Sequence, residues 1–197
     1  MHLHPDPAIL RADSSNTSMI APSMATRAVV TVGCLLFASM LPVTLLVPPL
    51  KELVGDRYAV SPFWVHTFMS VNMIGAVLGA PLIGFLSDRR RRGRFAALAL
   101  AAAACLLSAM SFAPNLPCHM ALRFLEGAAH ILGLSTLMAV AGGWAVAGKR
   151  GRTMGVVGSA MMLGTACGTG LGGEVWRLMP AWTFQVAGFI RAPADIA

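Results

Sequence analysis

The sequence predicts an all-α protein that crosses a membrane several times, and its composition and the spacing of its charges carry this prediction. The chain of 197 residues is 56% hydrophobic and only 12% charged, with a mean hydropathy of +0.70. Soluble domains carry roughly 25% charged residues, so this chain has too few charges to cover a surface in water. Its charges also gather in short segments between long uncharged stretches. Inside hydrocarbon the backbone must satisfy its own hydrogen bonds, and helices do so.

The uncharged stretches locate the helices. About 20 apolar residues cross the roughly 30 Å of hydrocarbon in a bilayer, because an α-helix rises 1.5 Å per residue. Five stretches reach this length, and a sixth is too short to span. We predict helices at about 28–50, 61–87, 95–113, 118–146 and 154–174, with a partial helix at 180–190.

The two ends of the chain lie outside this helical domain, which covers residues 28–190. Residues 1–27 are polar and mixed, so we predict a disordered tail, or an over-extended start with Met19 or Met24 as the true first residue. Residues 191–197 form a short second tail. Because the sixth stretch stops before it has crossed a bilayer, we expect a chain truncated relative to a longer parent.

The distribution of Lys and Arg predicts the orientation. Ten of these residues lie in the amino tail and in the loops after the second and fourth helices, against three in the intervening loops. Short cytoplasmic loops retain an excess of positive charge, which places the amino terminus in the cytoplasm and the chain in a cell membrane, for instance a bacterial inner membrane. The arginine run 89–92 then lies in a tight cytoplasmic turn, where lipid headgroups are its expected partner and nucleic acid is not.

The cysteines and histidines predict no cofactor and no metal site. All four cysteines, Cys34, Cys105, Cys118 and Cys167, lie in or beside apolar helices, and no two of them form a C-x-x-C pair. Such cysteines usually act as small packing residues.

The fourth helix carries charged residues inside an apolar segment. Arg123, Gly127 and His130 share one helical face, and Glu126 lies about 60° to the side. The spacing allows Arg123 to pair with Glu126 and Glu126 with His130. Two interpretations remain open: an ion pair near the membrane interface, or a proton or substrate relay, since charge in a membrane usually marks such a route.

The fifth helix carries small residues at every fourth position. Ala160, Gly164, Gly168 and Gly172 form a stripe that allows a neighbouring helix to approach backbone to backbone.

Three motifs in order make the chain resemble the amino-terminal half of a major facilitator superfamily transporter, in particular the drug:proton antiporter branch. Between helices two and three, the family's G-x-L-x-D-R-x-G-R latch motif is matched with two additional arginines. The fourth-helix motif R-x-x-x-G is matched by Arg123 and Gly127, and the fifth-helix antiporter motif by five glycines, with Thr169 in place of its proline. The latch residues are Gly84, Leu86, Asp88, Arg89, Gly93 and Arg94, and the antiporter glycines are Gly155, Gly164, Gly168, Gly172 and Gly173.

The resemblance implies a six-helix half of a two-half fold that transports by alternating access. It implies proton-coupled efflux of small amphipathic or drug-like compounds, with Arg123 and Gly127 of the R-x-x-x-G motif linked to proton transfer. From their positions in the helices, we further expect Glu126 or His130 to take up the proton beside Arg123, and Asn72 and Glu126 to line the substrate pocket. The resemblance further implies membrane lipid, protons, a small-molecule substrate and a complementary transporter half as partners, and no enzymatic activity. The alternatives are a sugar or metabolite transporter of the same superfamily, or a membrane fragment that binds other helices without transport.

Overall fold

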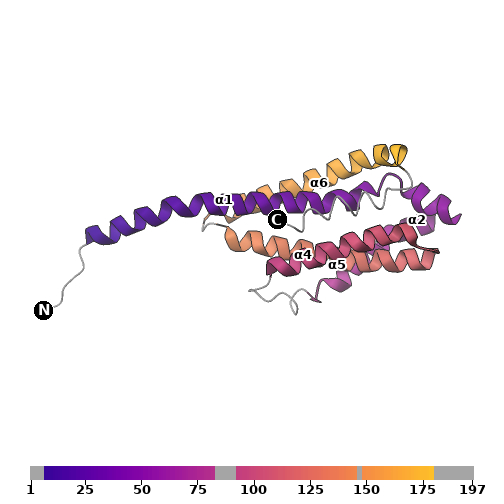
Figure 1. The fold of residues 1–197 in the computed structure, drawn as a ribbon, viewed down its shortest axis with the longest axis horizontal. Helices are drawn as coiled ribbons and strands as arrows, with labels where there is room; N and C mark the ends of the chain where they lie inside the picture. Colours follow the sequence, from indigo (N-terminus) through magenta and orange to yellow (C-terminus); the bar gives the residue numbers. More distant parts are fainter. Residues whose placement is uncertain (1–6, 83–91, 146–147, 180–197) are drawn as a thin grey trace.

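The computed structural model describes residues 7–82, 92–145 and 148–179, and its regular elements there are all helical (Figure 1). Between the long helices, the described residues include two brief helical segments, η1 and η2. In chain order the elements are α1 (Pro7–Leu45), the π-helical segment η1 (Lys51–Asp56), α2 (Pro62–Gly79), α4 (Arg92–Ala109), the 3-10 segment η2 (Met110–Phe112), α5 (Leu116–Trp144) and α6 (Arg150–Leu178).

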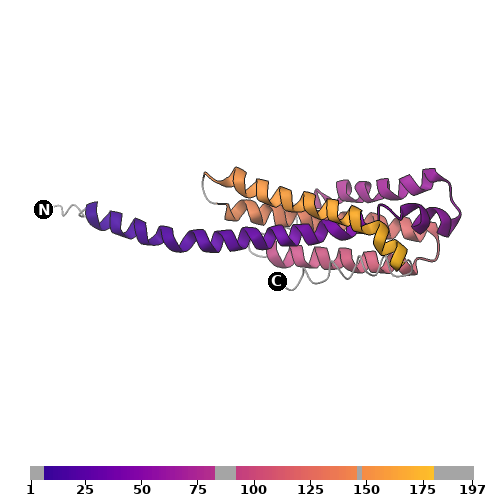
Figure 2. The same cartoon turned by 90° about the horizontal axis from the view of Figure 1, so that it is seen from above.

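The helices pack as an elongated bundle in which α5 is central. Helix α5 packs against both α2 and α4, and it also contacts α1 and α6. Helices α1 and α6 lie side by side along the other side of the bundle, as both views show (Figures 1 and 2). Three glycines of α6 lie against α1 in the same order along both helices, Gly164 at Phe37, Gly168 at Leu41 and Gly172 at Leu45. The two helices therefore run parallel.

Prolines and a capping asparagine fix where the helices begin. Pro62 opens α2, where its missing N–H costs no hydrogen bond. Helix α5 begins after Asn115, whose side chain accepts a hydrogen bond from the backbone N–H of Cys118 at 2.9 Å. Such a cap satisfies one of the N–H groups that a helix start leaves without an intrahelical partner.

Four helical segments are long and apolar enough to cross a membrane: residues 26–45 of α1, residues 92–112, α5 and α6. Helix α2 is not among them. It spans 18 residues in the structure, and the uncharged stretch that predicted it continues beyond Leu82 into residues that the structure does not describe. The prediction of an all-α membrane protein is confirmed.

The helix boundaries differ from the predicted ones at both ends of the first helix. Helix α1 begins at Pro7, so residues 7–27, predicted as a disordered tail, are helical in the structure. The same helix ends at Leu45 instead of continuing to 50, because Pro48 and Pro49 follow and proline cannot donate an intrahelical hydrogen bond. The predicted partial helix at 180–190 and the tail 191–197 lie outside the described residues.

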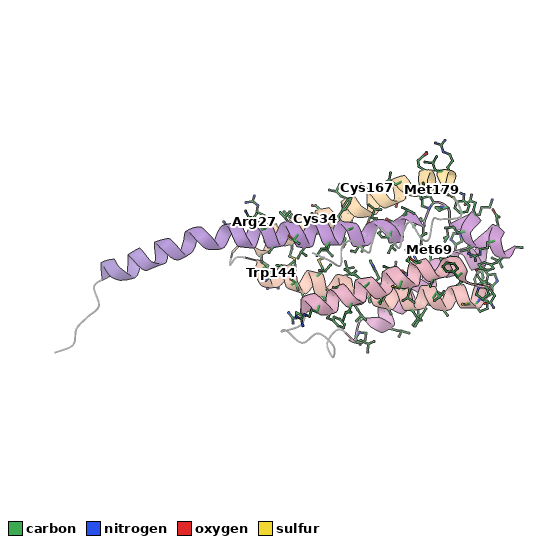
Figure 3. The ribbon with its side chains drawn as sticks, viewed as in Figure 1. Arg27, Cys34, Met69, Trp144, Cys167 and Met179 are labelled. Carbon is green, nitrogen blue, oxygen red and sulfur yellow. The ribbon has the colours of Figure 1, made fainter. Side chains whose placement is uncertain are left out.

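Buried apolar side chains form two clusters at different levels of the bundle. One cluster includes Leu46, Phe68 and Met110, near the end of the bundle that carries Tyr58. The other includes Leu36, Leu100, Leu137 and Val157, nearer the opposite end. Figure 3 marks the two ends by Met179 and Trp144 respectively. Along α5, Arg123 and Glu126 fall between the two clusters and are themselves buried.

A buried ion pair as candidate functional site

Arg123 and Glu126 form an ion pair inside the helical bundle. Both side chains lie on α5 with 0% exposure, and the Arg123 Nη1 atom donates to Glu126 Oε2 at 2.9 Å. Their spacing of three residues puts them on one side of the helix, as the sequence predicts. Because neither side chain reaches the surface, the two charges stabilise one another within the protein rather than at a solvated edge.

Asn72 of α2 completes this site from the neighbouring helix. Its Nδ2 atom donates to Glu126 Oε2 at 2.7 Å and lies 3.5 Å from the backbone oxygen of Arg123. One carboxylate oxygen therefore accepts hydrogen bonds from two helices. We predicted Asn72 as a substrate-lining residue, whereas in the structure it is 5% exposed and bonded to Glu126.

Glycines bring α2 and α5 close enough for this contact. A Cβ atom at Gly127 would overlap the backbone oxygen of Asn72 and approach its Nδ2 atom to 2.9 Å. On α2, a Cβ atom at Gly75 would overlap the backbone oxygen of Phe124, and one at Gly79 would lie 3.0 Å from Ala128 Cα. The two helices therefore cross backbone to backbone, as small residues permit in membrane proteins.

The guanidinium of Arg123 is also held by two side chains of α2. Its Cζ atom lies 5.4 Å from the ring centroid of Phe68, within the range of a cation–π interaction. Its Nη2 atom lies 3.9 Å from the sulfur of Met69 of α2, a residue that is labelled in Figure 3. The arginine is thus positioned by an aromatic face and a thioether as well as by its carboxylate.

A second buried group, which the sequence did not single out, lies one turn before Arg123. His119 has 0% exposure, its Nδ1 atom lies 3.1 Å from the Tyr58 hydroxyl, and its ring stands edge-on to Phe68 with centroids 4.8 Å apart. Tyr58 also lies 3.3 Å from the backbone oxygen of Ala113. A histidine at the start of an apolar helix gives no distinctive sequence signal, since its partner Tyr58 is 61 residues away.

Arg57 links the segment that carries Tyr58 to the connection between α4 and α5 by hydrogen bonds. Its Nη2 atom donates to the backbone oxygens of Ser111 and Ala113, at 3.2 and 2.9 Å. Burial raises the pKa of the Tyr58 phenol above its ordinary value, and the nearby Arg57 charge opposes that shift. The phenol therefore keeps its proton at neutral pH and remains able to donate a hydrogen bond.

The geometry of this site allows one simple reaction, which is protonation of the Glu126 carboxylate. Two buried charges are tolerated when they pair and when hydrogen bonds satisfy their remaining atoms, whereas removal of one partner leaves an uncompensated charge. Protonation of Glu126 would neutralise the carboxylate and deprive Arg123 of its counter-charge.

The comparison with protein families decides the broader identity. The family model described as Major Facilitator Superfamily matches residues 32–194 of the chain. The chain belongs to the major facilitator superfamily. Together with the four apolar helices, this match makes the protein a multi-pass membrane transporter of that superfamily. A search of curated proteins gave no match.

The predicted fifth helix is α6 in the structure, and the five glycines that match the antiporter motif on it divide into two groups by their contacts. A Cβ atom at Gly164, Gly168 or Gly172 on α6 would overlap backbone oxygens of α1, those of Phe37, Leu41 and Leu45 respectively. At Gly155 and Gly173 an added Cβ atom would meet nothing within 4 Å. Three of the five matched glycines thus serve the contact between α1 and α6, and the other two do not face a neighbouring helix among the described residues.

The remaining predicted site residues are placed in part. Gly84, Leu86, Asp88 and Arg89 of the latch motif lie outside the described residues, whereas Gly93 and Arg94 stand exposed in the first turn of α4. His130 is half-buried on α5, one turn beyond Glu126. The latch function of the loop and the coupling function of His130 remain predictions.

Proposed function

We propose that this superfamily member couples the movement of protons to efflux of small amphipathic or drug-like compounds by alternating access. The observation that carries the proposal is the ion pair between Arg123 and Glu126, which is fully buried on a helix long enough to span a membrane. Charged side chains in such helices cost about 2.5–3.5 kcal/mol each on insertion scales and are therefore usually retained for transport.

The proposed coupling residue is Glu126, with His130 as the second candidate. A proton that enters from outside converts the Glu126 carboxylate to a neutral acid, and Arg123 is left without its counter-charge. Removing the charge of one partner from a buried ion pair destabilises the folded protein by about 3–5 kcal/mol. The protonated state therefore favours a rearrangement that gives Arg123 a new partner. A ligand can shift a two-state equilibrium only by its differential binding to the two states, and here the proton acts as that ligand.

The proposal assigns export and a drug-like substrate because of the antiporter glycines on α6. Three of these five glycines form the close contact with α1, which is consistent with a helix specialised for that motif. The same contact occupies the glycine stripe within this chain, so the stripe offers no separate argument for a helix-binding protein without transport. A sugar or metabolite remains the alternative substrate class.

Further parts of the proposal concern the surroundings of the chain. We propose a cell membrane with the amino terminus in the cytoplasm, because ten of the Lys and Arg residues counted lie in segments assigned to that side and three in the opposite ones. The superfamily builds its substrate cavity between two halves. The proposed transport therefore needs a second six-helix unit opposite the face formed by this one.

The direct test is efflux of ethidium from cells that produce the chain, alone and together with candidate second halves. Glu126→Gln and Arg123→Ala should abolish efflux above the level of empty vector. The matched control is Glu174→Gln, because Glu174 and Arg177 form an ion pair of the same spacing on α6 with side chains 59% and 74% exposed. Efflux that survives Glu126→Gln and Arg123→Ala at the control level would contradict the proposal.

A further inference from the structure

A continuous series of contacts joins the Tyr58 end of the bundle to the buried ion pair. The Tyr58 hydroxyl meets His119 Nδ1 at 3.1 Å, and the His119 ring meets the Phe68 ring. The Phe68 ring in turn lies 5.4 Å from the Arg123 guanidinium. Each of these side chains is buried or half-buried, so the series runs through the protein rather than over its surface.

The positions on α5 place His119 in line with the ion pair. At 100° per residue, His119, Arg123 and Glu126 lie within about 60° of one another around the helix axis. His119 is one turn from Arg123 and two turns from Glu126, on the side towards the Tyr58 end. A proton that enters at this end reaches His119 before it reaches Glu126.

The Tyr58 hydroxyl can bind its two neighbours in two ways. It has a single proton, which it donates either to the backbone oxygen of Ala113 at 3.3 Å or to His119 Nδ1 at 3.1 Å. In the first arrangement a protonated Nδ1 donates to the phenol oxygen, and in the second Nδ1 accepts. Rotation of one hydroxyl therefore exchanges the donor and the acceptor, as passage of a proton requires.

We propose that His119, together with Tyr58, is the station that receives the proton at the outer end and passes it towards Glu126. This proposal rests on the proposed function, and it assigns to the route two residues that the coupling scheme above does not use. One proton from external water binds an imidazole nitrogen of His119. It then leaves that nitrogen for a carboxylate oxygen of Glu126, so that His119 returns to its neutral form and Glu126 becomes a neutral acid.

The charges around His119 favour transfer over retention of the proton. Arg57 from the segment before α2 and Arg123 from α5 both flank this region, and the hydroxyl of Tyr58 and the thiol of Cys118 are the neighbouring titratable groups. Phe68 is the neighbour from α2. Between two arginines an imidazolium is disfavoured, whereas the carboxylate of Glu126 attracts the proton. Two helical turns rise about 10 Å, so the proposed transfer from His119 to Glu126 requires at least one water molecule between the two groups.

The test follows the proton at Glu126 itself. The full chain in lipid nanodiscs receives a light-released proton pulse, and time-resolved infrared spectroscopy records the carbonyl band of a protonated carboxylic acid. The band that disappears in Glu126→Gln belongs to Glu126. His119→Gln and Tyr58→Phe should each slow the rise of this band by about tenfold or more, because a positioned acid–base group typically contributes at least that much.

The controls separate a proton route from a structural effect. His66→Gln is the matched variant, since His66 is exposed on α2 and should leave the rate unchanged. An unchanged final amplitude of the band in His119→Gln and Tyr58→Phe shows that the ion pair is intact. A band that rises at the parental rate in either variant removes that residue from the route. The absence of any Glu126 band in the parent chain would instead overturn the proposed coupling function.

Discussion

Gly127 of α5 lies directly against the backbone oxygen of Asn72 on α2, with no space for a Cβ atom between them. The contact fixes the distance between the two helices. It also sets the position from which the Asn72 side chain reaches Glu126 at 2.7 Å. The two residues of the R-x-x-x-G motif therefore have different functions in one region of α5. Gly127 allows α2 to pack closely, and Arg123 neutralises the charge of Glu126.

We expect Gly127→Ala to destabilise the protein by about 1–3 kcal/mol, the usual cost of extra volume in a packed interior. The Cβ atom would meet backbone rather than a flexible side chain, so the helices must separate and the bond from Asn72 to Glu126 must lengthen. Thermal unfolding in detergent measures the effect. Gly155→Ala is the control, because an added Cβ atom there meets nothing within 4 Å. Equal stability of the two variants would show that the close crossing is absent.

Replacing one charged residue of the Arg123–Glu126 pair by a neutral one should lower the stability of the protein more than replacing both. Arg123→Met leaves a buried carboxylate without its cation, which we expect to destabilise the protein by about 3–5 kcal/mol. The double variant Arg123→Met with Glu126→Leu should recover much of that loss, since no unpaired charge remains. Unfolding by a denaturing detergent compares the two.

The exposed pair on α6 provides the scale for that experiment. Glu174→Gln should change stability by well under about 1 kcal/mol, because exposed ion pairs contribute little. A single Arg123 variant as stable as this control would indicate that the α5 pair is solvated.

The contact between α1 and α6 should depend on position along the glycine stripe. Gly168→Ala would place a Cβ atom against Thr44 Oγ1 and the backbone oxygen of Leu41, whereas Gly173→Ala would place one where no atom lies within 4 Å. We therefore expect lower thermal stability for Gly168→Ala by about 1–3 kcal/mol and no loss for Gly173→Ala. The reverse order would assign the stripe to a different neighbour.

The single tyrosine of the chain offers a direct optical check of the Tyr58 end. Burial raises the pKa of Tyr58, so the phenolate absorbance should appear with a midpoint above about 10, the usual tyrosine value. Arg57→Gln removes a cation that favours the phenolate and should move the midpoint further upward. A midpoint at or below about 10 in the folded parent protein would mean that Tyr58 is exposed to water.

The membrane fold could be predicted from sequence because hydrocarbon imposes a simple rule on length and charge. A run of about 20 predominantly apolar residues is long enough to cross the bilayer as a helix, and four helices of this kind are present in the described residues. Helix ends were less predictable. Pro48 and Pro49 end α1 early, and residues 7–27 continue the helix although their composition suggested a tail.

The candidate site could be predicted only along one helix. The spacing of Arg123 and Glu126 predicted their pairing, because residues three apart on a helix face the same side. The donor Asn72 lies 54 residues from Glu126, and Tyr58 lies 61 residues from His119. No local periodicity links such positions, since only the packing of α2 and the preceding segment against α5 brings them together.

The sequence by itself determined that the chain is a helical membrane protein, where most of its helices lie and which charges are placed within them. The tertiary structure decided that the Arg123–Glu126 pair has no exposure to solvent, that Asn72 bonds to its carboxylate, and that His119 stands between this pair and Tyr58. The physical reason is that length and hydropathy act on each helix separately, whereas burial and hydrogen bonding depend on which faces of different helices meet.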